Sequence, residues 1–106
     1  MSIKKFLLKM IQLDESWKTY TIKDIDQGIH IAAWIEDTLL KQYSKHVRHD
    51  TIGIITGYYD SKELVCTVTM YRYPNAQDIH EITICIKPEL IKENDILQQE
   101  MFDLLL

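Results

Sequence analysis

The chain has 106 residues, of which 46% are apolar and 26% are charged, with only three glycines and two prolines. This length suits a single domain, and the composition excludes a disordered or low-complexity chain. Apolar runs stay far below the roughly 18 residues that cross a bilayer, so we expect neither a membrane anchor nor a signal peptide. We expect one folded domain over residues 1–106.

The net charge is −4 and it is unevenly spread, because residues 51–106 carry nine acidic and four basic side chains. Nucleic-acid binding relies on clustered lysine and arginine, which displace counterions from phosphates, whereas here the basic residues are scattered. We therefore expect no direct nucleic-acid partner. Two cysteines cannot form the disulfide framework of a small secreted protein, so the sequence favours a cytoplasmic location.

The first predicted element covers residues 2–13. Five apolar residues there recur at the spacing of one helical face, which predicts a short helix: Ile3, Phe6, Leu7, Met10 and Ile11. A strand is the alternative, because Leu8 and Met10 also alternate with polar neighbours.

A long helix is predicted over residues 22–44. Thr21 and Asp24 have the form of a capping box, and an apolar helical rhythm follows them. Gly28 inside this helix costs about 1 kcal/mol relative to alanine, which indicates a packing reason for the missing side chain. We expect another element to approach the helix closely at Gly28.

After a basic linker at 45–50 the apolar period changes to two, which predicts strands at 51–59, 63–73 and 79–87 joined by hairpin loops. From Glu89 onward a helical face returns, with Pro88 suited to the first turn. The predicted fold is therefore α+β: a three-stranded antiparallel meander packed on one face by helices, in the order α-α-β-β-β-α.

Loop lengths pair Tyr59 with Glu63 and Tyr73 with Ile79, and this register assigns the strand residues to two faces. One face is apolar, so we expect helices to cover it: Ile52, Ile54, Leu64, Cys66, Val68, Met70, Ile82, Ile84 and Ile86. The other face is rich in tyrosine and threonine: Thr51, Ile55, Tyr59, Val65, Thr67, Thr69, Tyr71, Tyr73, Ile79, Glu81 and Thr83. Tyrosine suits protein recognition, although both residue types are also simply good strand formers. Cys66 belongs to the core, and Cys85 is a free thiol on the opposite side.

Three further features of the sequence each allow more than one interpretation. The last helix lines up four acids on one side, as a docking face for a basic partner or a solvated polar face: Glu89, Glu93, Glu100 and Asp103. Trp34 lies opposite the main apolar stripe of the long helix, where it either anchors a partner or packs under the first helix. Glu36 lies inside the stripe, as a buried acid paired with a lysine, as the sign of a different helix rotation, or as a catalytic carboxylate.

No group of residues in the sequence predicts a catalytic, metal-binding or cofactor-binding site. His46-x-x-His49 followed by Asp50 resembles a metal-ligand spacing, but no third histidine or cysteine completes it, and Lys45 and Arg48 would repel a cation. There is no glycine-rich phosphate loop and no recognisable nucleophile motif. We expect no metal, no cofactor and no enzyme activity.

The sequence therefore predicts a small acidic protein-binding module with another protein, basic in character, as its partner. The most concrete version is a bacterial immunity or antitoxin-type inhibitor that occludes a toxin, for example a nuclease. The predicted contacts are Tyr59, Tyr71, Tyr73, Trp34, Glu89, Glu93, Glu100 and Asp103. One alternative is a phage or mobile-element accessory protein that forms a homo-oligomer through the sheet. Another is a small enzyme that uses Glu36 with His30 or His80.

Overall fold

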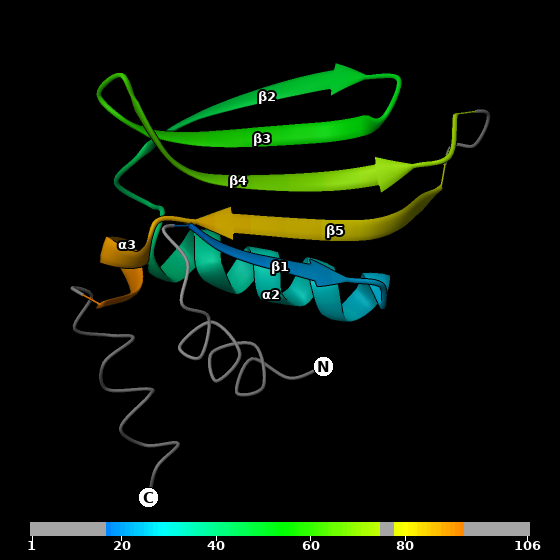
Figure 1. The fold of residues 1–106 in the computed structure, drawn as a ribbon, viewed down its shortest axis with the longest axis horizontal. Helices are drawn as coiled ribbons and strands as arrows, with labels where there is room; N and C mark the ends of the chain where they lie inside the picture. The colour runs from blue at the N-terminus through cyan, green and yellow to red at the C-terminus, as the bar shows by residue number, and fades with distance from the viewer. Residues whose placement is uncertain (1–16, 75–77, 93–106) are drawn as a thin grey trace, which may run out of the picture.

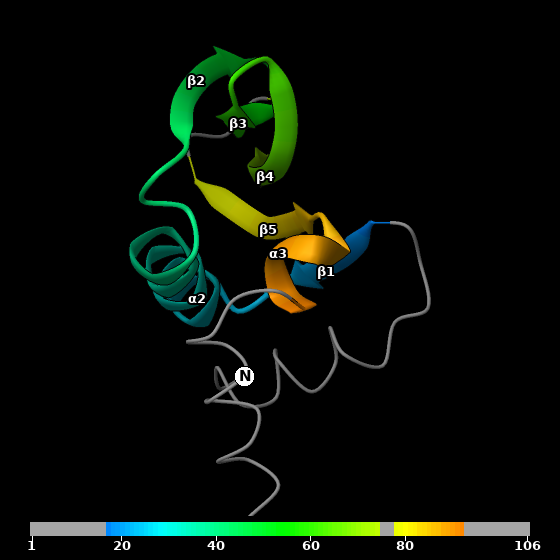
Figure 2. The same cartoon turned by 90° about the vertical axis from the view of Figure 1, so that its left-hand side faces the viewer.

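The computed structural model describes residues 17–74 and 78–92, which form one antiparallel sheet with a helix on one face (Figure 1). In chain order the elements are β1 (Lys18–Ile22), α2 (Ile25–Thr38), β2 (Ser44–Asp50), β3 (Gly53–Asp60), β4 (Glu63–Arg72), β5 (Ile79–Ile86) and α3 (Pro88–Lys92). The strands lie in the order β1-β5-β4-β3-β2. The end-on view in Figure 2 shows α2 on one side of β5 and β1, and none of the described elements covers the opposite face.

The predicted order α-α-β-β-β-α and the three-stranded meander are wrong, because the sheet has five strands. β3, β4 and β5 lie close to the three expected ranges. β2 occupies the expected linker and the last residue of the helix predicted at 22–44, and β1 covers residues with no predicted element together with the first residue of that helix. The described part of the last helix is the five-residue α3. The helix expected at 2–13 falls outside the described residues.

β2 escaped prediction because it is an edge strand that is exposed on both faces. Within the described part of the chain it pairs only with β3, and every residue from Ser44 to His49 is exposed. Apolar and polar residues alternate in a strand when one of its faces packs against a core. Because α2 does not extend over β2, neither face of β2 has to be apolar. Val47 is its one aliphatic residue, and the resulting run of polar residues resembles a linker.

β1 carries a signal that sequence analysis passed over. Lys18–Ile22 contains Tyr20 and Ile22 between threonines, the alternation of aromatic and β-branched residues that favours a strand. β1 pairs with β5 from Lys18 opposite Ile86 to Ile22 opposite Ile82. This pairing joins segments about sixty residues apart in the chain. No turn sequence next to β1 could therefore have predicted it.

α2 is shorter than the predicted helix at both ends. It begins after Asp24, whose Oδ1 accepts a hydrogen bond of 3.2 Å from the N–H of Gln27. Thr21 is not the cap, because it belongs to β1 and its hydroxyl lies 3.1 Å from that of Thr83 on β5. At the other end the helix stops at Thr38, and residues 39–40 remain buried beyond it.

The packing reason predicted for Gly28 is present in the structure. Gly28 is buried against β5, and a Cβ at this position would lie 2.8 Å from Cδ1 and 3.3 Å from Cβ of Ile82. The first distance is closer than carbon atoms tolerate and the second is tight, so glycine lets α2 lie this near to the sheet without displacing Ile82. The missing side chain therefore sets the distance between α2 and β5.

The core lies between α2 and the neighbouring strands. Its most completely buried side chains are Ile31, Ile35, Leu40, Cys66, Ile82, Ile84 and Ile86. Three side chains leave their predicted faces, namely Ile52, Leu64 and Val65. Ile52 is 45% exposed in the turn after β2. Between Tyr58 and Tyr59 the register with β4 shifts, so that Tyr59 pairs with Leu64 rather than Glu63 and Val65 becomes an extra, buried residue of a bulge.

Candidate functional site

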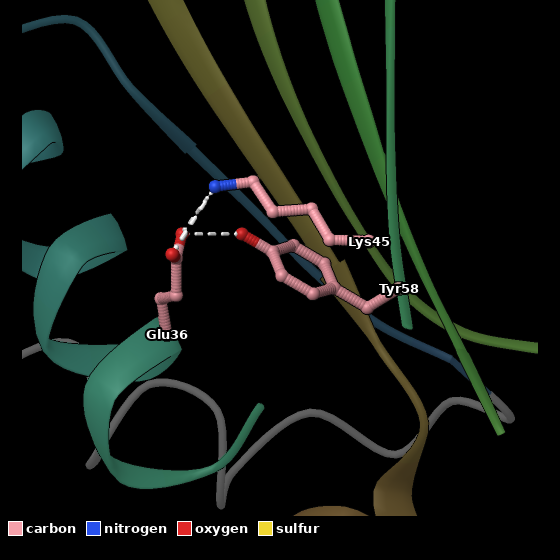
Figure 3. A network of polar contacts seen from close by, with 3 residues as sticks. All are labelled: Glu36, Lys45 and Tyr58. Atoms are coloured by element: carbon pink, nitrogen blue, oxygen red, sulfur yellow. Dashed lines mark hydrogen bonds and ion pairs between the residues drawn. The ribbon is translucent and has the colours of Figure 1, made fainter. Parts of the chain in front are cut away.

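A polar network joins α2 to β2 and β3 (Figure 3). Tyr58 of β3 donates a hydrogen bond of 2.7 Å to Oε2 of Glu36. Lys45 at the start of β2 donates from Nζ to both carboxylate oxygens, at 3.1 and 3.2 Å. The Tyr58 bond lowers the pKa of the Glu36 carboxyl, with Lys45 adding to the effect. Burial and the bond to Glu36 raise the pKa of the Tyr58 phenol.

This network explains the position of Glu36 in the apolar stripe without a catalytic role. Of the three alternatives for Glu36, pairing with a lysine is present, but the side chain is 42% exposed rather than buried. Within the described chain its partners are Tyr58 and Lys45 and no histidine, and a lowered pKa makes a carboxylate a weaker base. Glu36 positions the β2–β3 hairpin against α2.

A hollow of about 390 Å³ lies between the end of α2, the β3–β4 turn and the start of α3. We call it the acidic hollow; its lining is Leu39, Gln42, Tyr43, Asp60, Glu63, Val65, Lys87, Glu89 and Leu90. Leu39 and Val65 are 3% and 5% exposed, which makes part of the lining a fixed apolar surface.

Carboxylates dominate the charge of the acidic hollow. Asp60, Glu63 and Glu89 are all exposed, whereas Lys87 is the one cation of the lining. Lys87 donates a hydrogen bond to Oε1 of Glu63, and its Nζ lies 6.0 Å from the centre of the Trp17 ring. Two carboxylates are left with no ion-pair partner among the described residues. An apolar surface beside spare carboxylates suits a side chain with an aliphatic stem and a cationic head.

A second, smaller hollow of about 310 Å³ lies on the open face of the sheet. We call it the Tyr59 hollow; its lining is His46, Val47, Arg48, Ile55, Gly57, Tyr59, Leu64 and Thr67. The Tyr59 ring lies over Gly57, where a Cβ would come within 2.9 Å of Cε2. The His46 ring meets Tyr59 edge to face, with centroids 5.2 Å apart.

The predicted contact residues do not form one patch. Tyr59 and Tyr71 lie on the open face, and Tyr73 follows β4, 62% exposed and stacked on His80 with centroids 4.1 Å apart. Trp34 is partly buried against the core, which disfavours an exposed anchor. Glu89 lines the acidic hollow. Glu93, Glu100 and Asp103 lie outside the described residues.

Sequence analysis missed Asp60 and Glu63, which the structure brings together with Glu89. They flank the turn between β3 and β4, while Glu89 begins α3 after β5. The available signal was an acid on each side of a hairpin turn, but Asp60 was interpreted only as part of the loop and Glu63 only as the first residue of a strand. Its position beside α3 follows from strand order, which no local pattern reports.

The histidine pair at positions 46 and 49 does not form a metal site. Both residues lie on β2, and side chains three apart on a strand point to opposite faces. Among the described residues no three histidine, cysteine or acidic side chains are placed to hold an ion. The two cysteines are both free, with Cys66 buried and Cys85 accepting a hydrogen bond of 3.3 Å from the hydroxyl of Thr19.

Comparison of the chain with protein-family models, curated proteins and solved structures finds no match. Within residues 17–74 and 78–92, no helix combines the length and the hydrophobicity that crossing a bilayer requires. The functional argument therefore begins with the two hollows and the charges around them.

Proposed function

We propose that this protein is a protein-binding module that takes up a lysine or arginine side chain of a basic partner in the acidic hollow. The observation that supports it is the meeting of Asp60, Glu63 and Glu89 around the buried side chains of Leu39 and Val65. Three carboxylates on a solvated surface repel one another, and a bound cation relieves that repulsion.

The hollow matches both parts of such a side chain. The methylene stem of an arginine packs on Leu39, Val65 and Leu90, and its guanidinium donates two parallel hydrogen bonds to a carboxylate such as that of Glu89. Residues 93–106, which continue from α3, carry four acidic and no basic side chains. Their charge adds to the field that attracts a basic partner and raises its association rate.

Within this proposal the partner we favour is a toxin with a basic cleft, such as a nuclease, and the protein acts as its immunity or antitoxin-type inhibitor. Nuclease clefts are positive because their substrates are polyanions, so an acidic protein that covers the cleft matches its field. Inhibition is then steric: substrate and inhibitor occupy the same surface. The net charge of −4 supports this version.

The hollow is tested directly with the amide of N-acetylarginine in an NMR titration. We expect chemical-shift changes at the methyl groups of Leu39, Val65 and Leu90, weakened by the double substitution Glu63→Gln with Glu89→Gln. Asp26→Asn with Asp37→Asn, on exposed positions of α2, is the control that removes the same charge and leaves the shifts unchanged. Absence of shifts at these methyls, or equal shifts in both double variants, rejects the hollow as a cation site.

The partner class needs a separate experiment. The reading frame beside this gene is expressed together with the protein, and complex formation is measured at low and high salt. An inhibitor of a basic toxin forms a complex that weakens with salt and with the Glu63 and Glu89 substitutions, and it abolishes the toxic activity. Recovery of the protein as a monomer with no partner at any salt concentration contradicts this version.

A further inference from the structure

No strand of the described residues pairs with the outer edge of β2. β2 is the last strand of the sheet and pairs only with β3. Alternate residues of such a strand turn their N–H and C=O groups away from the sheet. Because residues 44–49 are all exposed, these groups are accessible to another strand.

The side chains of β2 define what kind of strand fits. Arg48 borders the Tyr59 hollow, and its side chain is 72% exposed. Its Nε lies 3.5 Å from Oδ2 of Asp50, and an exposed ion pair of this kind is weak enough for a carboxylate of a partner to join or replace it. On the other face Val47 is 49% exposed, since none of the described strands lies beyond it. The edge thus offers a cation and an apolar side chain on adjacent residues.

A second copy of this chain is a poor occupant of the edge. Antiparallel pairing of β2 with itself over its full length places Lys45 opposite His49, and His46 opposite Arg48, in both copies. Basic side chains directly opposite one another destabilise a strand pair. Lysines on edge strands are also a common protection against self-association. A strand with acidic residues at these positions reverses the sign of each contact.

We propose that the free edge of β2 binds an extended acidic segment of a partner protein as a sixth strand. Backbone hydrogen bonds to β2 hold the segment, a carboxylate opposite Arg48 gives it charge selectivity, and an apolar residue opposite Val47 covers the exposed valine. This surface goes beyond the proposed cation site, because the linings of the acidic hollow and the β2 edge share no residue.

The probe is a capped peptide, Thr-Glu-Val-Glu-Val-Glu-Thr, and its counterpart has lysine in place of each glutamate. We expect amide shift changes and slowed hydrogen exchange within residues 44–50 for the glutamate peptide. Arg48→Glu lowers affinity for the glutamate peptide about tenfold and raises it for the lysine peptide. Lys62→Glu, in the exposed β3–β4 turn, makes the same change of net charge and leaves the affinity unchanged.

Four outcomes overturn the proposal: no binding of the glutamate peptide, equal binding of both peptides, shifts that lie away from β2, or no effect of Arg48→Glu. Sedimentation equilibrium tests whether a second copy of the chain binds this edge instead. A dimer that Arg48→Glu disrupts would assign the edge to a second copy and would also overturn the proposal. Glu63→Gln with Glu89→Gln leaves peptide binding intact, so failure here is distinguishable from failure of the cation site.

Discussion

Tyr58 and Glu36 lie 22 positions apart in the chain, and the 2.7 Å hydrogen bond between them links β3 to α2. The phenol is 3% exposed, whereas the carboxylate is open to solvent on its other side, where Lys45 reaches it. The bond therefore crosses the boundary between core and surface. Removal of either side chain leaves the other without this hydrogen-bond partner. The first two predictions follow from this mutual dependence.

Tyr58→Phe and Glu36→Gln each destabilise the protein by about 1 kcal/mol, since a hydrogen bond to a charged group is lost at a partly solvated site. In the double variant the two losses do not add, and the coupling free energy is about 1 kcal/mol. Urea unfolding of the four proteins measures this cycle. Asp37→Asn removes a neighbouring exposed carboxylate and is expected to change the stability by less than about 0.5 kcal/mol. Strict additivity of the two losses contradicts the pairing.

The same pair makes stability depend on pH in the acid range. The folded state lowers the pKa of Glu36 below its ordinary value of 4.5, chiefly through the Tyr58 bond. The ionised carboxylate therefore contributes stability that is complete above pH 4.5 and is lost as the pH falls through the folded-state pKa. The stability gap between wild type and Glu36→Gln should narrow over this window. In Tyr58→Phe, an NMR titration of the Glu36 carboxyl should show its pKa moving back up toward 4.5.

Gly28→Ala should destabilise the protein, although alanine favours a helix by about 1 kcal/mol. The added Cβ meets Ile82, which is fully buried and has no room to withdraw, and overpacking of this kind costs about 1 to 3 kcal/mol. Ile82→Val removes the Cδ1 atom that lies nearest. In that background Gly28→Ala should become neutral or stabilising, as thermal unfolding of the four proteins will show. A Gly28→Ala variant as stable as wild type would mean that α2 and β5 are not in close contact.

The two thiols should differ sharply in reactivity. Cys66 is inaccessible in the core, and burial raises its pKa to about 12, so neither access nor ionisation favours attack. Cys85 lies half-buried on the open face. A thiol reagent should label Cys85 in the native protein and Cys66 only after denaturation, which Cys85→Ser tests by leaving Cys66 alone. Rapid labelling of native Cys85→Ser would show that the core around Cys66 opens.

Local pattern located the central strands but not the edges. β3, β4 and β5 alternate because one of their faces meets a core, and that alternation is visible within ten residues. The start of α2 was misplaced because Thr21 and Asp24 are both good caps, and only the pairing of Thr21 with Thr83 decides between them. Leu64 and Val65 exchanged faces because one bulge residue shifts the parity of everything before it.

The candidate site divides in the same way. Three properties follow from residue types and from the two-residue period of the strands, both of which can be seen within a short stretch of sequence. They are the acidic character, the tyrosine-bearing face and the separation of Cys66 from Cys85. The gathering of Asp60 and Glu63 with Glu89 could not be predicted, because it depends on which ends of β3, β4 and β5 meet. The same is true of the contact between Glu36 and Tyr58.

By itself the sequence determined that this chain has an isoleucine-rich core, a net negative charge and strands with one covered face, since each of these follows from side chains and their spacing. Only the tertiary structure decided that 44–50 is a strand, that β1 closes the other side of the sheet, and that three carboxylates share one hollow. An edge strand buries too little to impose a pattern, and contacts between distant segments leave no period in the chain.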